Sequence, residues 1–162
     1  DSYGFNRAEN WNNYNTTKDL ILELVDIVSR GGNLLLNIGP NADGTIPVVM
    51  QERLIEMGRW LAVNGEGIYD THRIETPSIL SENQQLYFTG KSDALYAFFT
   101  KWTSEIRFPW KKNKPTNATL LGTDLPLDFE LKDNELIVKI PRLTIDEIPC
   151  LHLWGVKICY QK

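Results

Sequence analysis

Several features that would by themselves assign a protein to a class are scarce in this sequence of 162 residues. Its two histidines, His72 and His152, stand alone without the spacing of metal ligands, so we expect neither a metal site nor a cofactor. A formal net charge of -4 gives no reason to expect nucleic acid or an anionic membrane as a partner. No apolar run approaches the ~20 residues that are needed to span a bilayer. With 42% hydrophobic and 23% charged residues, the composition is that of an ordinary globular protein.

Cysteine is also scarce, because Cys150 and Cys159 are the only two in the sequence. They flank one extended segment, which separates them by roughly 30 Å at ~3.3 Å per residue. A disulfide needs Cα atoms within about 7 Å of each other, so we expect two separate, buried or half-buried thiols.

The first half of the sequence alternates between helical periodicity and one apolar run. Residues 16–19 combine a threonine cap with an acid in the first turn, and the helix that they begin ends at Gly31-Gly32. The apolar run of residues 34–38 is typical of a strand that is buried on both faces, as parallel strands are. Pro47 then begins a second helix, which closes at Asn64-Gly65. One face of this second helix carries Met50, Leu54, Met57 and Leu61.

Helix, buried strand, loop and helix in this order are what a (β/α) repeat looks like. We therefore expect residues 1–70 to be the C-terminal segment of a (β/α)8 barrel. A complete barrel takes about 250 residues, and an apolar strand with two unpaired edges cannot stand alone. The sequence, which opens on DSYGFN, predicts that an N-terminal barrel portion lies upstream.

After about residue 68 the pattern changes to short alternating stretches with polar breaks. Residues 86–89 and 95–99 are separated by Gly-Lys-Ser-Asp, which is a hairpin signal. Several strands without helices between them predict a small antiparallel β-sandwich over residues 71–162. Further strands are expected at residues 119–121, 129–131, 135–140 and 151–158, with a turn at residues 132–134.

Specific motifs in both halves resemble the α-L-fucosidases of glycoside hydrolase family 29. The barrel-like half carries SYGFNR at residues 2–7, GGNLLLNIGP at 31–40, DGTIP at 43–47, QERL at 51–54 and NGEGIY at 64–69. The resemblance continues downstream with DALYAFF at 93–99 and WGVK at 154–157. It covers essentially the whole sequence, as the C-terminal portion of such an enzyme.

The resemblance implies a function for the protein. Family members hydrolyse α-linked L-fucose with retention, which requires two carboxyl groups about 5 to 5.5 Å apart, one as nucleophile and one as acid/base. The family has both residues upstream of the matched segment, so no catalytic residue is expected here and the chain alone should be inactive. The carboxylates of the barrel-like half are not expected to act directly: Asp1, Glu9, Asp43, Glu52 and Glu66.

Two residues are the predicted substrate-binding positions. Tyr3 matches a family position where an aromatic ring packs on the C5-C6 face of fucose, although the family often has Trp or Phe there; the alternative is an ordinary barrel aromatic. Asn37 is polar in an otherwise apolar strand, near the end that faces the active site in barrels. Its alternative role is a hydrogen bond to the neighbouring loop. Arg7 is a weaker candidate for the leaving-group side.

A second class of function stays open, in which the sandwich is a non-catalytic carbohydrate-binding or structural module. Trp102, Trp110 and Trp154 lie in this half, and we expect them in the core, with Trp110 the most surface-like because two lysines follow it. Trp60 is expected on the outer layer of the barrel. The family further implies a fucosylated glycan as partner, a possible homo-oligomer, and a secreted, periplasmic or lysosomal location.

Overall fold

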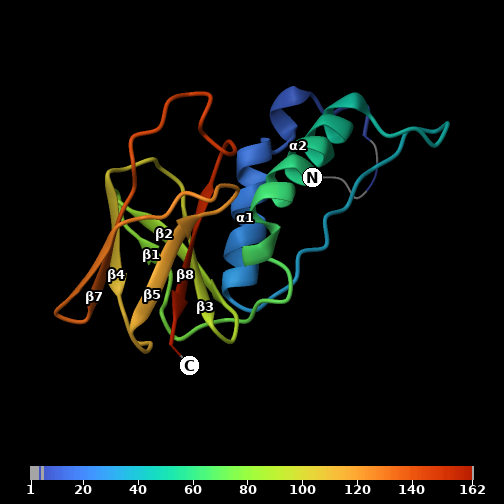
Figure 1. The fold of residues 1–162 in the computed structure, drawn as a ribbon. Coiled ribbons are helices and arrows are strands. Elements are labelled where there is room, and N and C mark those ends of the chain that lie inside the picture. The colour runs from blue at the N-terminus through green and yellow to red at the C-terminus, as the bar shows by residue number, and fades with distance from the viewer. Residues whose placement is uncertain (1–3, 5, 162) are drawn as a thin grey trace.

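The computed structural model describes residue 4 and residues 6–161 of the chain. Two antiparallel sheets lie on one side of the molecule and two helices on the other (Figure 1). The helical half contains η1 (Trp11–Asn13), α1 (Thr17–Ser29), α2 (Val48–Asn64) and η2 (Gly65–Gly67). The sheets contain β1 (Ile79–Leu80), β2 (Gln85–Gly90), β3 (Ala94–Phe99), β4 (Glu105–Pro109), β5 (Pro115–Leu120), β6 (Phe129–Lys132), β7 (Glu135–Lys139) and β8 (Trp154–Tyr160). No described helix is both long enough and apolar enough to span a membrane.

Both predicted helices form, with the predicted ends. The Thr16 hydroxyl accepts a hydrogen bond from the Asp19 backbone N–H at 3.2 Å, and the Asp19 side chain accepts one from the Thr16 N–H. This reciprocal cap satisfies two donors that a helix start leaves without partners. Gly31 follows the end of α1 with φ of 86°, a conformation in which glycine has no steric penalty. Pro47 precedes α2, and Gly65 closes it.

The strand predicted at residues 34–38 is absent, and this prediction is wrong for the described chain. Residues 32–41 have no regular secondary structure, and the connection from α1 to α2 swings out as a long loop (Figure 1). Leu35 within it is 94% exposed. A strand exists only when a neighbour pairs with its backbone N–H and C=O groups, and no described strand lies beside this run. An apolar sequence is therefore not sufficient to form a strand here.

The second half forms the predicted antiparallel sheets. One sheet has the order β1-β2-β3-β8-β5 and the other β4-β7-β6. The predicted hairpin is confirmed as β2 and β3, with Leu86 opposite Phe99. The predicted turn between β6 and β7 is also confirmed, with Asp133 and Asn134 at positive φ of 51° and 64°. Sequence reasoning missed β1 and β4, and it began the last strand three residues early, since β8 starts at Trp154.

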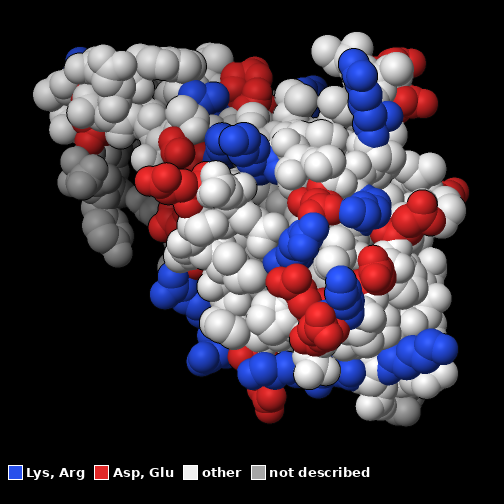
Figure 2. Space-filling model, turned by 90° about the vertical axis from the view of Figure 1, so that its left-hand side faces the viewer, with Lys and Arg blue, Asp and Glu red and all other residues white. Residues whose placement is uncertain are grey.

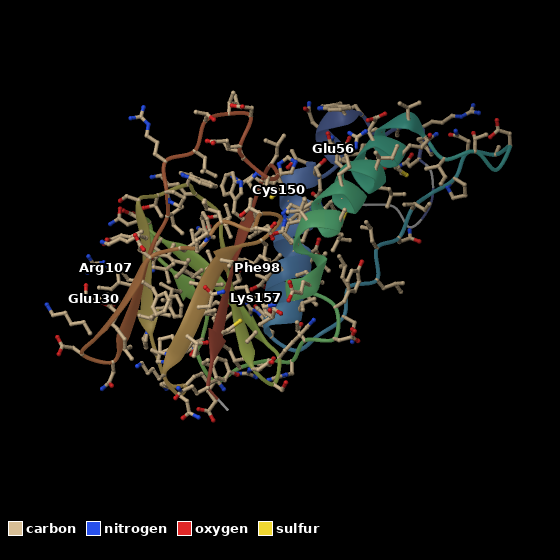
Figure 3. All side chains as sticks on the ribbon, in the orientation of Figure 1. Glu56, Phe98, Arg107, Glu130, Cys150 and Lys157 are labelled. Atoms are coloured by element: carbon tan, nitrogen blue, oxygen red, sulfur yellow. The ribbon has the colours of Figure 1, made fainter. Side chains whose placement is uncertain are left out.

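The five-stranded sheet is covered on both faces, which gives the molecule three layers. Alternate residues such as Phe88 and Phe99 join the core between the two sheets. Their neighbours Tyr96 and Phe98 join a second core, together with Ile21 of α1 and other helical residues. All six residues of β3 are consequently buried. The side chains of Phe98 and Lys157 project from this sheet toward the helices, whereas Arg107 and Glu130 lie on the far, outer side of the molecule (Figure 3).

The outer face of the three-stranded sheet is polar. Glu105 forms ion pairs with Arg107 on its own strand and with Lys139 on the neighbouring strand. Acidic and basic side chains are interspersed over this side of the molecule (Figure 2). Balanced charges of this kind are typical of a solvated sheet face. β4 accordingly alternates between charged and apolar residues, whereas β7 carries its two charged residues, Glu135 and Lys139, at its ends.

The predicted core positions of the sandwich tryptophans are confirmed, with one correction. Trp102 and Trp154 pack edge to face with ring centroids 5.1 Å apart, against the core between the sheets. Trp110 is not the surface-like member, because it is 5% exposed and its indole N–H donates to the Asn113 carbonyl at 2.9 Å. The lysines that follow it point outward at the turn. The two cysteines are free thiols, as expected.

Candidate functional site

The candidate site is a hollow of about 280 Å³ where the segment before α1, the long loop and α2 meet. Glu9, Asn13 and Tyr14 contribute from the segment before α1. Asn37 contributes from the loop, and Arg53 from the second turn of α2. Leu20, Leu36, Ile38, Met50 and Leu54 supply apolar walls. An apolar hollow with a few converging polar groups is the usual form of a small-ligand site.

The structure places one of the two predicted substrate-binding residues in this hollow. Asn37 lines it from the loop, beside Ile38 and Gly39. Its side chain is exposed, so the end of the apolar run does face an open space, although the run is not a strand. Tyr3 lies outside the described residues, while the adjacent Gly4 lines the hollow. Arg7 is exposed and is not among the lining residues.

Two interactions organise the polar wall of the hollow. Partial burial and a hydrogen bond with the Glu9 carboxylate raise the pKa of the Tyr14 hydroxyl. Arg53 donates from Nε to the Asn15 carbonyl at 3.1 Å. The Arg53 guanidinium carbon also stands 5.0 Å from the centroid of the Trp11 ring, within the range of a cation–π contact. The tip of α2 is therefore tied to the segment that precedes α1.

The described carboxylates of the first half lie in separate surroundings. Glu9 is the one described carboxylate that lines the hollow. Asp43 accepts hydrogen bonds from the Thr45 N–H at 3.0 Å and hydroxyl at 2.7 Å, and these bonds hold its pKa below the usual range. Glu66 pairs with Lys157 of β8, far along the chain. Glu52 is exposed on α2, and Asp1 lies outside the described residues.

One carboxylate cannot carry out retaining hydrolysis, which needs a nucleophile and an acid/base on opposite sides of the glycosidic bond. Nor does the described part of the chain contain a cluster of three or more His, Cys, Asp or Glu side chains that could hold a metal ion. The chemistry that the hollow itself offers is hydrogen bonding and apolar contact. It can bind and orient a ligand.

Among the residues that sequence reasoning missed are Tyr14 and Arg53 of the hollow and Trp11, which contacts Arg53. A signal for them existed, because residues 10–15 read Asn-Trp-Asn-Asn-Tyr-Asn, an unusual density of amides and aromatic rings. The contact of Arg53 with this segment had no such signal. It joins residues 38 positions apart and depends on how α2 packs beside α1.

Comparison with known proteins agrees with the resemblance seen in the motifs. The alpha-L-fucosidase family model matches residues 1–66, and the model of the alpha-L-fucosidase C-terminal domain matches residues 81–159. Plasma alpha-L-fucosidase of Homo sapiens is 39% identical over 166 aligned positions. Tissue alpha-L-fucosidase of Homo sapiens is 33% identical over 164. Each alignment covers 97% of this chain but only 35% and 34% of the relative, so the chain spans about a third of their length.

The fold gives the same answer as the sequence. The crystal structure of Thermotoga maritima alpha-fucosidase in complex with fucose superposes with a TM-score of 0.82 and 28% identity. The superposition covers 96% of this chain and 37% of that one. The two family models match consecutive parts of the chain, the relatives align over nearly all of it, and the fold is shared. The chain therefore belongs to the α-L-fucosidase family and corresponds to its C-terminal portion.

Proposed function

We propose that the protein of which this chain is the C-terminal part is a retaining α-L-fucosidase that removes terminal α-L-fucose from glycans. The observation that carries the proposal is the match of the chain, in order, to the α-L-fucosidase model and to the C-terminal domain model. The relatives in plasma and tissue are named for this activity. A secreted, periplasmic or lysosomal location accompanies the proposal.

In this proposal residues 1–70 are the last segment of a (β/α)8 barrel, and the rest of the barrel covers them. Support comes from the apolar side chains that the described chain leaves uncovered on α2 and the loop. Leu35 is 94% exposed, Leu54 37% and Ile55 46%. A neighbouring barrel strand would also pair with the backbone of residues 34–38, and it would turn this run into the expected parallel strand.

The catalytic nucleophile and acid/base belong to the upstream barrel portion, and this chain contributes to the substrate pocket. Asn37 would donate or accept a hydrogen bond to the bound sugar from the hollow. Tyr3 would pack its ring on the apolar C5-C6 face of fucose, where burying a methyl-sized group contributes about 1 kcal/mol. Residues 71–162 are the sandwich domain that braces the barrel.

The burial of its tryptophans favours a structural role for the sandwich, in which it supports the barrel, over a role in glycan binding. An aromatic platform for sugar must be exposed, whereas Trp110 is buried and both Trp102 and Trp154 pack on the core between the sheets. The other sheet face is covered by α1 and α2. The remaining face, the outer face of the three-stranded sheet, carries ion pairs and is typical of a solvated surface.

The test compares the 162-residue chain with the full-length protein on an aryl α-L-fucoside. We expect the full-length protein to hydrolyse it with retention and the chain alone to show no turnover. Proton NMR of the first fucose released distinguishes retention from inversion. A full-length protein without activity on any fucoside would refute the proposed function, and turnover by the chain alone would refute the placement of the carboxylates.

A further inference from the structure

A short segment beside the hollow combines the side chains that proteins use to bind sugars. Residues 10–15 hold four asparagines, one tryptophan and one tyrosine. The Asn10 backbone N–H donates to Asn13 Oδ1 at 2.8 Å, and the Asn12 N–H donates to Asn10 Oδ1 at 2.9 Å. These bonds form a reciprocal cap at the start of η1, and they hold the backbone of the segment that carries Trp11.

Trp11 is exposed and yet held in place. The side chain is 66% exposed, the highest exposure of any described aromatic among the large exposed apolar residues. The Arg53 guanidinium stands 5.0 Å from its centroid, and Arg53 is anchored in turn by its bond to the Asn15 carbonyl. One side of the indole is thus occupied by a cation, and solvent contacts the rest. A fixed aromatic surface loses little conformational entropy when a ligand covers it.

The chemistry of this segment matches a pyranose. A sugar ring presents an apolar C–H face that stacks on an aromatic ring, and a rim of hydroxyls that bond to planar amides. Asn13, Tyr14, Asn15 and Arg53 all line the hollow that Asn37 also lines, and Trp11 lies at its edge through Arg53. A sugar stacked on Trp11 would therefore be the neighbour of a sugar bound in the hollow.

We propose that residues 10–15 bind the sugar to which fucose is attached, with Trp11 as the stacking platform and the Asn12 amide as a hydrogen-bonding group. This inference rests on the proposed fucosidase function. Trp11 is then a residue that determines specificity for the leaving group, and it takes no part in breaking the bond. Substrates with a saccharide leaving group use the platform, whereas substrates without one do not.

The experiment uses the full-length enzyme and two substrates that differ only in leaving group. One is a fucosylated disaccharide, and the other is α-L-fucosyl fluoride, whose fluoride cannot reach a sugar platform. We expect Trp11→Ala to lower kcat/KM for the disaccharide about tenfold, the size of one good stacking contact, and to leave the fluoride unchanged. Trp11→Phe should restore most of the loss, and Asn12→Ala should show a smaller loss on the disaccharide alone. Tyr69→Ala, which removes another exposed ring (58%) outside the hollow, is the matched control.

Each outcome decides the inference. An equal fall on both substrates, with an unchanged unfolding temperature, would place Trp11 in the fucose pocket and overturn the assignment to the leaving group. No change on either substrate would overturn it as well. Hydrolysis of the fluoride by the wild-type enzyme tests the fucosidase proposal independently of Trp11. If the wild-type enzyme cleaves neither substrate, both proposals are refuted. If it cleaves both and Trp11→Ala does not discriminate between them, only the proposal for Trp11 is refuted.

Discussion

The indole N–H of Trp60 donates a hydrogen bond of 2.8 Å to the carbonyl oxygen of Leu153, and this bond ties α2 to the chain just before β8. Trp60 is 2% exposed, and its ring centroid lies 5.9 Å from that of Phe98 on β3. Trp60, which we expected on the outer layer of a barrel, is buried between α2 and the five-stranded sheet.

Because Trp60 connects α2 to the sheet, its replacement should destabilise the helices and the sheets together. We expect Trp60→Ala to lower the free energy of unfolding by about 3 to 5 kcal/mol, because it leaves a cavity and an unpaired Leu153 carbonyl. Urea denaturation followed by circular dichroism measures the change. Trp11→Ala, the same substitution at an exposed position, should change stability by less than about 0.5 kcal/mol. Equal changes in the free energy of unfolding for the two variants would contradict the burial of Trp60 between α2 and the sheet.

A second prediction concerns the close approach of η2 to the sheet. A Cβ atom on Gly67 would lie 2.7 Å from the Phe98 ring and 3.0 Å from the Tyr96 ring, closer than atoms tolerate. We expect Gly67→Ala to destabilise the chain by about 1 to 3 kcal/mol, the usual cost of overpacking. Gly58→Ala is the control, because a Cβ at Gly58 meets nothing within 4 Å and the residue is exposed inside α2. This change should stabilise the chain by about 0.5 to 1 kcal/mol. Thermal unfolding that ranks Gly67→Ala as the more stable variant would refute the contact.

A third prediction follows from the Glu66 carboxylate, which accepts hydrogen bonds from the Lys157 ammonium and, at 2.9 Å, from the Tyr96 hydroxyl. Burial opposes the charge on Glu66, but these bonds outweigh burial and lower its pKa. Burial and the bond to Glu66 in turn raise the pKa of Tyr96. A carboxyl with a lowered folded pKa contributes stability above its unfolded pKa of about 4.3, and this contribution is lost as pH falls through the folded pKa.

Glu66→Gln should therefore be less stable than the parent at neutral pH, and the difference should disappear at an acidic pH below the folded pKa of Glu66. The difference should not exceed about 1 kcal/mol, because the Glu66 side chain is 46% exposed and solvent screens the pair. A double-mutant cycle with Lys157→Met at both pH values isolates the coupling. A coupling that persisted at the lower pH would show that the ion pair is not its source.

A fourth prediction concerns the cysteines, which are free thiols. A reducing agent should leave the unfolding midpoint unchanged, since no disulfide closes a loop. Burial raises the pKa of Cys150, so its thiol should react slowly with a thiolate-specific reagent in the folded chain. Two thiols per chain should react once denaturant is added. Fewer than two would show a disulfide that the structure does not contain.

Local signals in the sequence were sufficient for most elements. The ends of α1 were predictable because the Thr16 cap and Gly31 act within one turn of the helix. The β2–β3 hairpin was predictable for the same reason, since its turn lies between two apolar runs. Family motifs added the identity of the chain. Asn37, which was singled out as the polar residue of an apolar run, lines the hollow.

Long-range packing was not predictable from these signals. Trp110 looks like a surface residue because lysines follow it, yet its ring packs edge to face on Tyr160, which is near only in the folded chain. The predicted strand at residues 34–38 failed for the opposite reason. Its composition suits a buried strand, but a strand is defined by its neighbours, and no described strand lies beside it.

The sequence by itself determined where helices begin and end, which segments alternate as strands, and the family to which the chain belongs, because caps, turns and motifs act over a few residues. Only the tertiary structure decided that the five-stranded sheet is buried on both faces and that Trp60 joins α2 to Leu153. It alone brought Arg53 to Trp11. These contacts join residues that are 38 to 93 positions apart in the sequence. They are stabilised by the burial of apolar surface between the layers, and no local sequence pattern encodes that burial.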